Sequence, residues 1–83
     1  MKLSDHAKNK LEIYNINEDE VISKCNKQIY EFYDTKEESH IKIIELQEIL
    51  FAVVYNNKAQ MIVTVYRTDR RTINNRQKNK RWI

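Results

Sequence analysis

Three side chains with acid–base or cationic chemistry recur every four residues near the start of the chain: His6, Lys10 and Tyr14. On a helix at about 100° per residue they fall at roughly 0°, 40° and 80°, beside the apolar positions Ala7 and Leu11. A side chain at the border of a buried stripe is held by packing while its polar tip stays wet, which suits a general base or a phosphate ligand. Amphipathic helices also place ordinary polar side chains at this border, so a structural role is the alternative.

The last predicted strand carries a second group of candidates. It alternates hydroxyl-bearing side chains on one face and ends in guanidinium groups: Thr64, Tyr66 and Thr68, then Arg67, Arg70 and Arg71. A sheet surface that combines hydroxyls, an aromatic ring and guanidinium groups can stack a base and hold its phosphate. The alternative is that these side chains only pack against neighbouring strands.

Charge is unevenly distributed along the 83 residues. Residues 1–66 carry 8 Lys and Arg against 11 Asp and Glu, whereas residues 67–83 carry 7 against 1. A concentrated basic end favours polyanions, most often nucleic acid, through counterion release. We therefore predict nucleic-acid contacts from the basic residues of this end: Arg67, Arg70, Arg71, Arg76, Lys78, Lys80 and Arg81. A solvated, frayed tail is the alternative for the same residues.

Several classes of site are disfavoured by composition. A chain without glycine has no glycine-rich phosphate loop and no nucleophile elbow. Cys25 is the single cysteine and is expected to be a small buried apolar residue, and His40 has no evident partner. No metal-ligand spacing occurs, so we expect neither a metal nor a cofactor. No apolar run reaches membrane-spanning length, which favours a cytoplasmic location.

Periodicity and capping residues predict two helices followed by four strands. The first helix covers residues 5–14 after Ser4 as N-cap, and Asn15 suits the left-handed position that follows it. The second starts after Asn17 and ends near Asn26. The period then changes to two, which predicts strands over 27–34, 40–46, 48–55 and 58–67.

Asparagine is expected to take the backbone positions that need positive φ, because the chain has neither Gly nor Pro. Asn56 and Asn57, between the last two strands, therefore predict a two-residue type I′ turn. That turn would pair Val54 with Ala59, Ala52 with Met61 and Leu50 with Val63.

The order of the elements predicts an α+β fold, with two N-terminal helices packed on a four-stranded antiparallel sheet (ααββββ). Residues 1–68 are expected to form this single domain, since a chain of 83 residues supports one core. Residues 69–83 are expected to be a basic C-terminal tail, and the alternatives are that they form a short helix or dock by Trp82.

Three short motifs give the chain a resemblance to a known family. They are "SDHA" at 4–7, with a basic residue four positions after the histidine, "NINEDEV" at 15–21, and "MIVTVYR" at 61–67. Together they resemble the bacterial domain-of-unknown-function family 4258, over residues 4–67. Members open with Ser-x-His-Ala, continue with Arg-x-x-x-Arg-Gly-Ile-Ser and close with a Val-x-Thr-Val-Tyr strand. Here Lys10, Tyr14 and Asn15 stand where that pattern has its two arginines and its glycine.

This family is similar to the RelE-like and BrnT-like toxins, compact α+β proteins that often act as metal-independent ribonucleases and are controlled by an antitoxin. The resemblance implies a catalytic role for His6, Lys10, Tyr66 and Arg67. In attack by a ribose 2′-hydroxyl, His6 would be the general base or acid, and Lys10 and Arg67 would neutralise the phosphate. Tyr66 would stack on a base or donate a proton. This mechanism requires His6 and Arg67 to face one concave surface.

We therefore predict an RNA-binding or metal-independent RNA-cleaving protein of the RelE-like toxin superfamily, with a toxin or mobile-element accessory as its context. The expected partners are RNA or another nucleic acid and an antitoxin protein, without a membrane. The alternatives are a noncatalytic nucleic-acid-binding module that uses the same basic end, and a protein-interaction domain that uses the sheet. The oligomeric state does not follow from the sequence.

Overall fold

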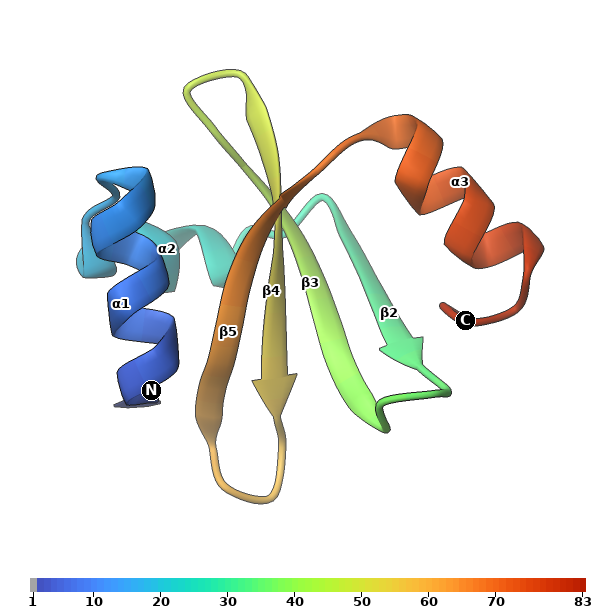
Figure 1. The fold of residues 1–83 in the computed structure, drawn as a ribbon, viewed down its shortest axis with the longest axis horizontal. Coiled ribbons are helices and arrows are strands. Elements are labelled where there is room, and N and C mark those ends of the chain that lie inside the picture. The colour runs from blue at the N-terminus through green and yellow to red at the C-terminus, as the bar shows by residue number, and fades with distance from the viewer. Residues whose placement is uncertain (1) are drawn as a thin grey trace.

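The computed structural model describes residues 2–83 and shows an α+β fold with helices on both faces of one sheet (Figure 1). The elements in chain order are β1 (Lys2–Leu3), α1 (Asp5–Tyr14), α2 (Glu18–Cys25), β2 (Tyr30–Asp34), β3 (Ser39–Leu46), β4 (Ile49–Asn56), β5 (Met61–Thr68) and α3 (Arg70–Lys78).

The sheet has five strands in the order β1-β5-β4-β3-β2, and it is mixed because β1 runs parallel to β5. The predicted α+β class and the two helices near the N-terminus are confirmed, but the prediction of a four-stranded, purely antiparallel sheet is wrong. Strand β1 pairs Lys2 with Met61 and Leu3 with Ile62. Two residues are too few for a periodic pattern, yet they give partners to an edge of β5 that would otherwise be open.

Helices α1 and α2 cover one face of the sheet and enclose the larger hydrophobic core. The helices are amphipathic, and the apolar positions spaced along one side of each are the ones that become buried. Main members of this core are Ala7, Leu11, Val21, Cys25, Ile44, Phe51, Val53, Tyr55, Ile62 and Val65. Cys25 is fully buried, as expected, and burial raises the pKa of its thiol although nearby Lys42 acts in the other direction.

Helix α3 lies on the opposite face and has a separate, smaller core (Figure 1). It buries only Ile73. Trp82, four residues beyond the helix, is 1% exposed and stacks on Phe32 with ring centroids 5.5 Å apart. For residues 69–83 the sequence was compatible with either a tail or a short helix. The structure shows a helix over 70–78 and a buried Trp82.

The turn after α3 brings the C-terminal residues back to the sheet. Lys80 has a φ of 59°, its N–H donates to the carbonyl of Gln77, and the N–H of Arg81 donates to that of Arg76. This is a Schellman motif, which reverses the chain direction. Ile83 and Tyr33 then exchange two backbone hydrogen bonds of 2.9 and 3.0 Å, so the C-terminal residues cover the outer edge of β2.

Capping residues fix α1 against β5. The Ser4 hydroxyl accepts a hydrogen bond from the N–H of Ala7 at 3.0 Å and donates to the carbonyl of Val63 at 2.6 Å. At the other end Asn15 has a φ of 57° and its N–H bonds to the carbonyl of Glu12, which confirms its left-handed position. Helix α1 therefore runs alongside β5, from the start of the strand toward its end.

Most of the turns, in contrast, do not use asparagine. The residues with positive φ are Asn15, Glu38, Gln47, Glu48, Gln60 and Lys80. The prediction for Asn56 and Asn57 is therefore wrong. The tight hairpin is the one between β3 and β4, where Leu46 pairs with Ile49 and both intervening residues, Gln47 and Glu48, have positive φ as a type I′ turn requires.

The register of β4 against β5 also differs from the prediction. Residues 57–60 form the connection, so Asn56 pairs with Met61, and a bulge lies between Val54 and Tyr55. The predicted pairs Val54–Ala59, Ala52–Met61 and Leu50–Val63 are therefore wrong, and the observed pairs are Val54–Thr64, Ala52–Tyr66 and Leu50–Thr68. An odd shift exchanges the faces of a strand. Tyr66 consequently lies on the α3 face, and Phe51, Val53 and Tyr55 lie in the α1–α2 core.

Candidate nucleic-acid interface

A hollow of about 360 Å³ lies between the C-terminal end of α3 and the sheet face that α3 leaves uncovered. Helix α3 buries one side chain only, and its C-terminal end forms one wall of this hollow. Its polar wall combines carboxylate, hydroxyl and guanidinium groups: Asp34, Glu37, Thr64, Tyr66, Arg76 and Arg81. Four of these, Thr64, Tyr66, Arg76 and Arg81, were candidates from the sequence, although as members of two different groups.

Asp34 fixes one side of this hollow. It is 2% exposed, and its Oδ1 accepts backbone hydrogen bonds of 2.9 Å from Lys36 and Glu37. Its Oδ2 accepts from the Trp82 indole at 3.0 Å and from Nε of Arg81 at 3.3 Å. A buried carboxylate with this many donors is held ionised and in one orientation. Asp34 therefore positions Arg81 at the wall of the hollow.

Arg76 lies on the opposite wall, in the last turn of α3. Its Nε is buried and has no hydrogen-bond partner among the described residues. An unpaired buried donor of a cationic group is costly unless a ligand or water satisfies it. The Arg76 side chain lines the hollow, so its guanidinium group is close to an acceptor that enters there.

Tyr66 closes the hollow from β5. Burial raises the pKa of its phenol above the ordinary value, and the charge of nearby Arg76 offsets only part of that rise. The hydroxyl therefore stays protonated at neutral pH and is able to donate a hydrogen bond beside the two guanidinium groups.

The outer surface of α3 and of the turn after it is strongly basic. Arg70, Arg71, Lys78 and Lys80 are exposed. Asp69 caps the helix by accepting a 2.7 Å hydrogen bond from Thr72, and this bond lowers the pKa of its carboxyl. Within residues 2–83 only Arg81 forms ion pairs, with Asp34 and Glu37, so the other cations of α3 are free to meet an external anion.

The remaining predicted catalytic residues lie on the other face of the sheet. His6 is exposed in the first turn of α1, and Lys10 is half-buried one turn later. Arg67 is exposed and lines a separate pocket of about 180 Å³ with Tyr14 and Phe51, whose rings meet edge to face at 5.5 Å.

The structure therefore does not bring the four predicted catalytic residues together. Tyr66 is separated from the others by the sheet itself. His6 and Arg67 share a face but lie at opposite ends of α1, because the eight residues from His6 to Tyr14 rise about 12 Å. A single phosphate is too small to contact both. The group that does converge is Tyr66 with Arg76 and Arg81.

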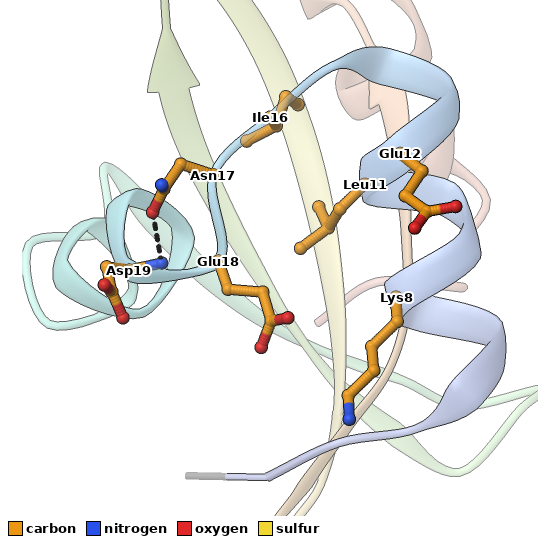
Figure 2. A pocket seen from close by; sticks show the side chains of 7 residues that line it. All are labelled: Lys8, Leu11, Glu12, Ile16, Asn17, Glu18 and Asp19. Atoms are coloured by element: carbon orange, nitrogen blue, oxygen red, sulfur yellow. Dashed lines mark hydrogen bonds between the residues drawn. The ribbon is translucent and has the colours of Figure 1, made fainter.

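A second open pocket, of about 500 Å³, lies between α1 and α2 and has the opposite charge (Figure 2). Glu12 projects from α1, and Glu18 reaches toward it from the first turn of α2, with Lys8 nearby. Asn17 accepts a 2.7 Å hydrogen bond from the N–H of Asp19, which caps α2 as predicted. This pocket between α1 and α2 therefore disfavours phosphate, in contrast to the basic surface on the α3 side.

Sequence reasoning missed Asp34 and Glu37 as parts of the site. They stand in "YDTKEES", which reads as a strand end and a polar loop. The side-chain partners of Asp34, Arg81 and Trp82, are 47 and 48 positions away, so no local spacing reveals them. The only available signal was an acidic residue in a strand with alternating apolar positions, which indicates a carboxylate that needs a partner.

Comparison with known proteins identifies no relative: no family model, no curated protein and no solved structure matches the chain. Among residues 2–83 no group of three or more His, Cys, Asp or Glu side chains is arranged to hold a metal ion. None of the helices in this part of the chain has the length and apolar character needed to cross a membrane.

Proposed function

We propose that this protein binds single-stranded RNA through α3 and the hollow beside it. The observation that carries the proposal is the convergence of Tyr66, Arg76 and Arg81 on one hollow, with a buried Nε of Arg76 that has no partner among residues 2–83. Guanidinium groups bind phosphate through paired N–H donors, and a tyrosine beside them adds a hydroxyl donor and a ring face.

The surrounding charges match a polyanion of some length. The exposed cations Arg70, Arg71, Lys78 and Lys80 extend the basic surface beyond the hollow. The hollow itself, at about 360 Å³, accepts a nucleotide that is splayed out of a strand. A paired base in a duplex is stacked between its neighbours, so a hollow of this kind favours single-stranded RNA.

Fluorescence anisotropy with a labelled single-stranded RNA tests the proposal. Arg76→Ala is expected to weaken binding by about tenfold, because a charge-assisted contact to phosphate is lost. Lys8→Ala is the matched control, since Lys8 is an exposed cation of α1 on the acidic side, and it is expected to bind as the wild type does. Equal affinities of wild type and Arg76→Ala contradict the proposal.

Deletion of residues 70–83 does not test RNA binding by itself, because it also removes core residues. The deletion removes Ile73 and Trp82 from the core on the α3 face and leaves Asp34 buried without two of its donors. Loss of binding would then report unfolding as well as lost charge. Substitutions of exposed cations separate the two effects.

Metal-independent RNA cleavage is a second candidate function, favoured by the position of Glu37 in the same hollow as Tyr66, Arg76 and Arg81. A carboxylate and a phenol are an acid–base pair for attack by the ribose 2′-hydroxyl, and the two guanidinium groups stabilise the phosphate charge. RNA cleavage in excess chelator, compared among wild type, Tyr66→Phe and His6→Ala, tests it. Activity lost only in His6→Ala would instead favour a reaction on the α1 side with Lys10 and Arg67.

The family resemblance of the sequence extends the proposal further. We propose a RelE-like arrangement for the α+β fold, a cytoplasmic location and the role of a toxin or mobile-element accessory, with an antitoxin as protein partner. The motifs at 4–7, 15–21 and 61–67 support this. Co-purification of the chain with the product of an adjacent gene tests the partner, and a stable complex that binds no RNA favours the protein-interaction alternative.

A further inference from the structure

A polar hollow of about 640 Å³, called the second hollow below, lies where the turn between β2 and β3 approaches the hairpin between β4 and β5. Glu37 and Ser39 line both this hollow and the one beside α3. The two hollows therefore adjoin at the turn between β2 and β3, with Tyr66 on the α3 face of the sheet and Tyr33 and His40 on the other face. A single strand of RNA that fills the first hollow therefore reaches the second by passing around this turn.

The second hollow contains a pair of aromatic rings from neighbouring strands. Tyr33 and His40 are directly paired between β2 and β3, and their ring centroids are 5.4 Å apart at 71°. Such an edge-on contact occupies at most one face of either ring. Tyr33 is 36% exposed, and neither side chain has a hydrogen-bond partner among residues 2–83. An open aromatic face with unused polar atoms is the feature on which proteins stack single-stranded bases.

The opposite wall supplies groups that read the edge of a base. Asn56 and Asn57 carry side-chain amides, and Lys58 adds a cation. Oδ1 of Asn56 accepts a 2.9 Å hydrogen bond from the N–H of Ala59, which leaves its amide N–H groups available. An amide that is fixed in this way presents donors in a defined direction.

The charges of the hollow select a base rather than a phosphate. Glu37 and Glu38 stand at the mouth, and Lys58 is the one cation opposite them. Two carboxylates repel a phosphate group, whereas an uncharged base is not repelled. The backbone of a bound strand is therefore expected to pass on the Lys58 side.

We propose that Tyr33 and His40 form a second nucleotide subsite, in which a base of single-stranded RNA stacks on the ring pair while an earlier part of the same strand occupies the hollow beside α3. The inference rests on the proposed RNA binding and adds the path of the strand. It predicts that affinity grows with RNA length until both hollows are filled.

Binding of an oligouridine of about 10 nucleotides and of a uridine dinucleotide, measured by anisotropy and by NMR chemical-shift changes, tests the subsite. Tyr33→Ala is expected to weaken binding of the longer RNA by about tenfold and to leave dinucleotide binding unchanged. His40→Ala is expected to act in the same direction. Tyr33→Phe keeps the ring and is the matched control, with affinity near that of the wild type.

The outcomes separate this inference from the function on which it rests. If Arg76→Ala weakens binding but Tyr33→Ala and His40→Ala do not, the subsite is wrong and the RNA-binding proposal stands. If neither RNA binds the wild type, both fail. Unfolding midpoints of each variant show whether it is folded, and the dinucleotide measurement on Tyr33→Ala shows whether the first hollow is intact.

Discussion

The indole N–H of Trp82 donates a 3.0 Å hydrogen bond to Oδ2 of Asp34, which lies 48 positions earlier in the chain. This bond joins the residues after α3 to the end of β2. Arg81 donates to the same oxygen, and the backbone of Trp82 forms a bridge with Asp34. One carboxylate thus holds the C-terminal segment and one wall of the candidate site together.

Asp34→Asn is expected to destabilise the fold by about 3 kcal/mol, because hydrogen bonds to a charged acceptor are lost and the guanidinium of Arg81 loses its counter-charge. The free energy of unfolding from denaturant titration measures this. Glu37→Gln is the control. Its side chain is 61% exposed, so a change within about 0.5 kcal/mol is expected. Equal effects of the two substitutions contradict the anchoring role of Asp34.

Stability is also expected to fall in acid through Asp34. Burial by itself raises the pKa of this carboxyl, but the hydrogen bonds from Glu37, Trp82, Lys36 and Arg81 outweigh burial and lower the pKa below its ordinary value. A lowered folded-state pKa contributes stability above the unfolded value, and that contribution is lost as the pH falls through the folded-state pKa. Between about pH 6 and pH 2, the wild type should lose more unfolding free energy than Asp34→Asn.

Replacement of the stacked indole separates packing from hydrogen bonding. Trp82→Ala is expected to cost about 4 kcal/mol, because it empties the space against Phe32 in the smaller core. Trp82→Phe keeps most of the ring contact but removes the donor to Asp34, and about 2 kcal/mol is expected. Thermal unfolding followed by circular dichroism ranks the two. Ile83→Ala serves as control, since that side chain is 67% exposed.

The hairpin between β3 and β4 offers a stabilising substitution. Gln47 and Glu48 have φ values of 52° and 66°, which cost free energy for residues with a Cβ. Changing them together to Asn-Gly, the preferred type I′ pair, is expected to raise the free energy of unfolding by about 1 kcal/mol. Asn57→Gly is the matched control. Because φ is not positive at Asn57, glycine there should not stabilise, and a gain at Asn57 would argue against the observed turns.

The parts of the fold that were predicted correctly depend on local patterns. Ser4 and Asn17 cap their helices and Asn15 ends α1, because each acts through atoms two to four residues away. The predicted turn at Asn56-Asn57 is wrong for a physical reason. Propensity favours Asn at positive φ, but the register is decided by which strand faces become buried against the helices. Burial of Phe51, Val53 and Tyr55 against α1 and α2 outweighed the Asn56-Asn57 signal.

The site shows the same division between local and long-range information. The basic character of residues 67–83 is a property of composition and could be predicted from the sequence. Which of these cations converge could not be predicted from composition. Arg76 and Tyr66 line the same hollow only because α3 lies on the sheet face to which the observed register assigns Tyr66. His6 and Lys10 do share a helix border, but that border is on the far side of the sheet from Tyr66.

The salt dependence of RNA affinity is expected to show that RNA contacts the basic residues of α3. For single strands, each phosphate contact contributes about 0.7 to the slope of log affinity against log salt concentration. Removing two exposed cations in Arg71→Ala with Lys78→Ala should lower the slope by about 1.4 and weaken binding at low salt. Lys8→Ala with Lys24→Ala removes two exposed cations from α1 and α2 and should leave the slope unchanged. If both pairs lower the slope equally, RNA is attracted by net charge alone, and the asymmetry between the acidic α1–α2 side and the basic α3 side has no part in binding.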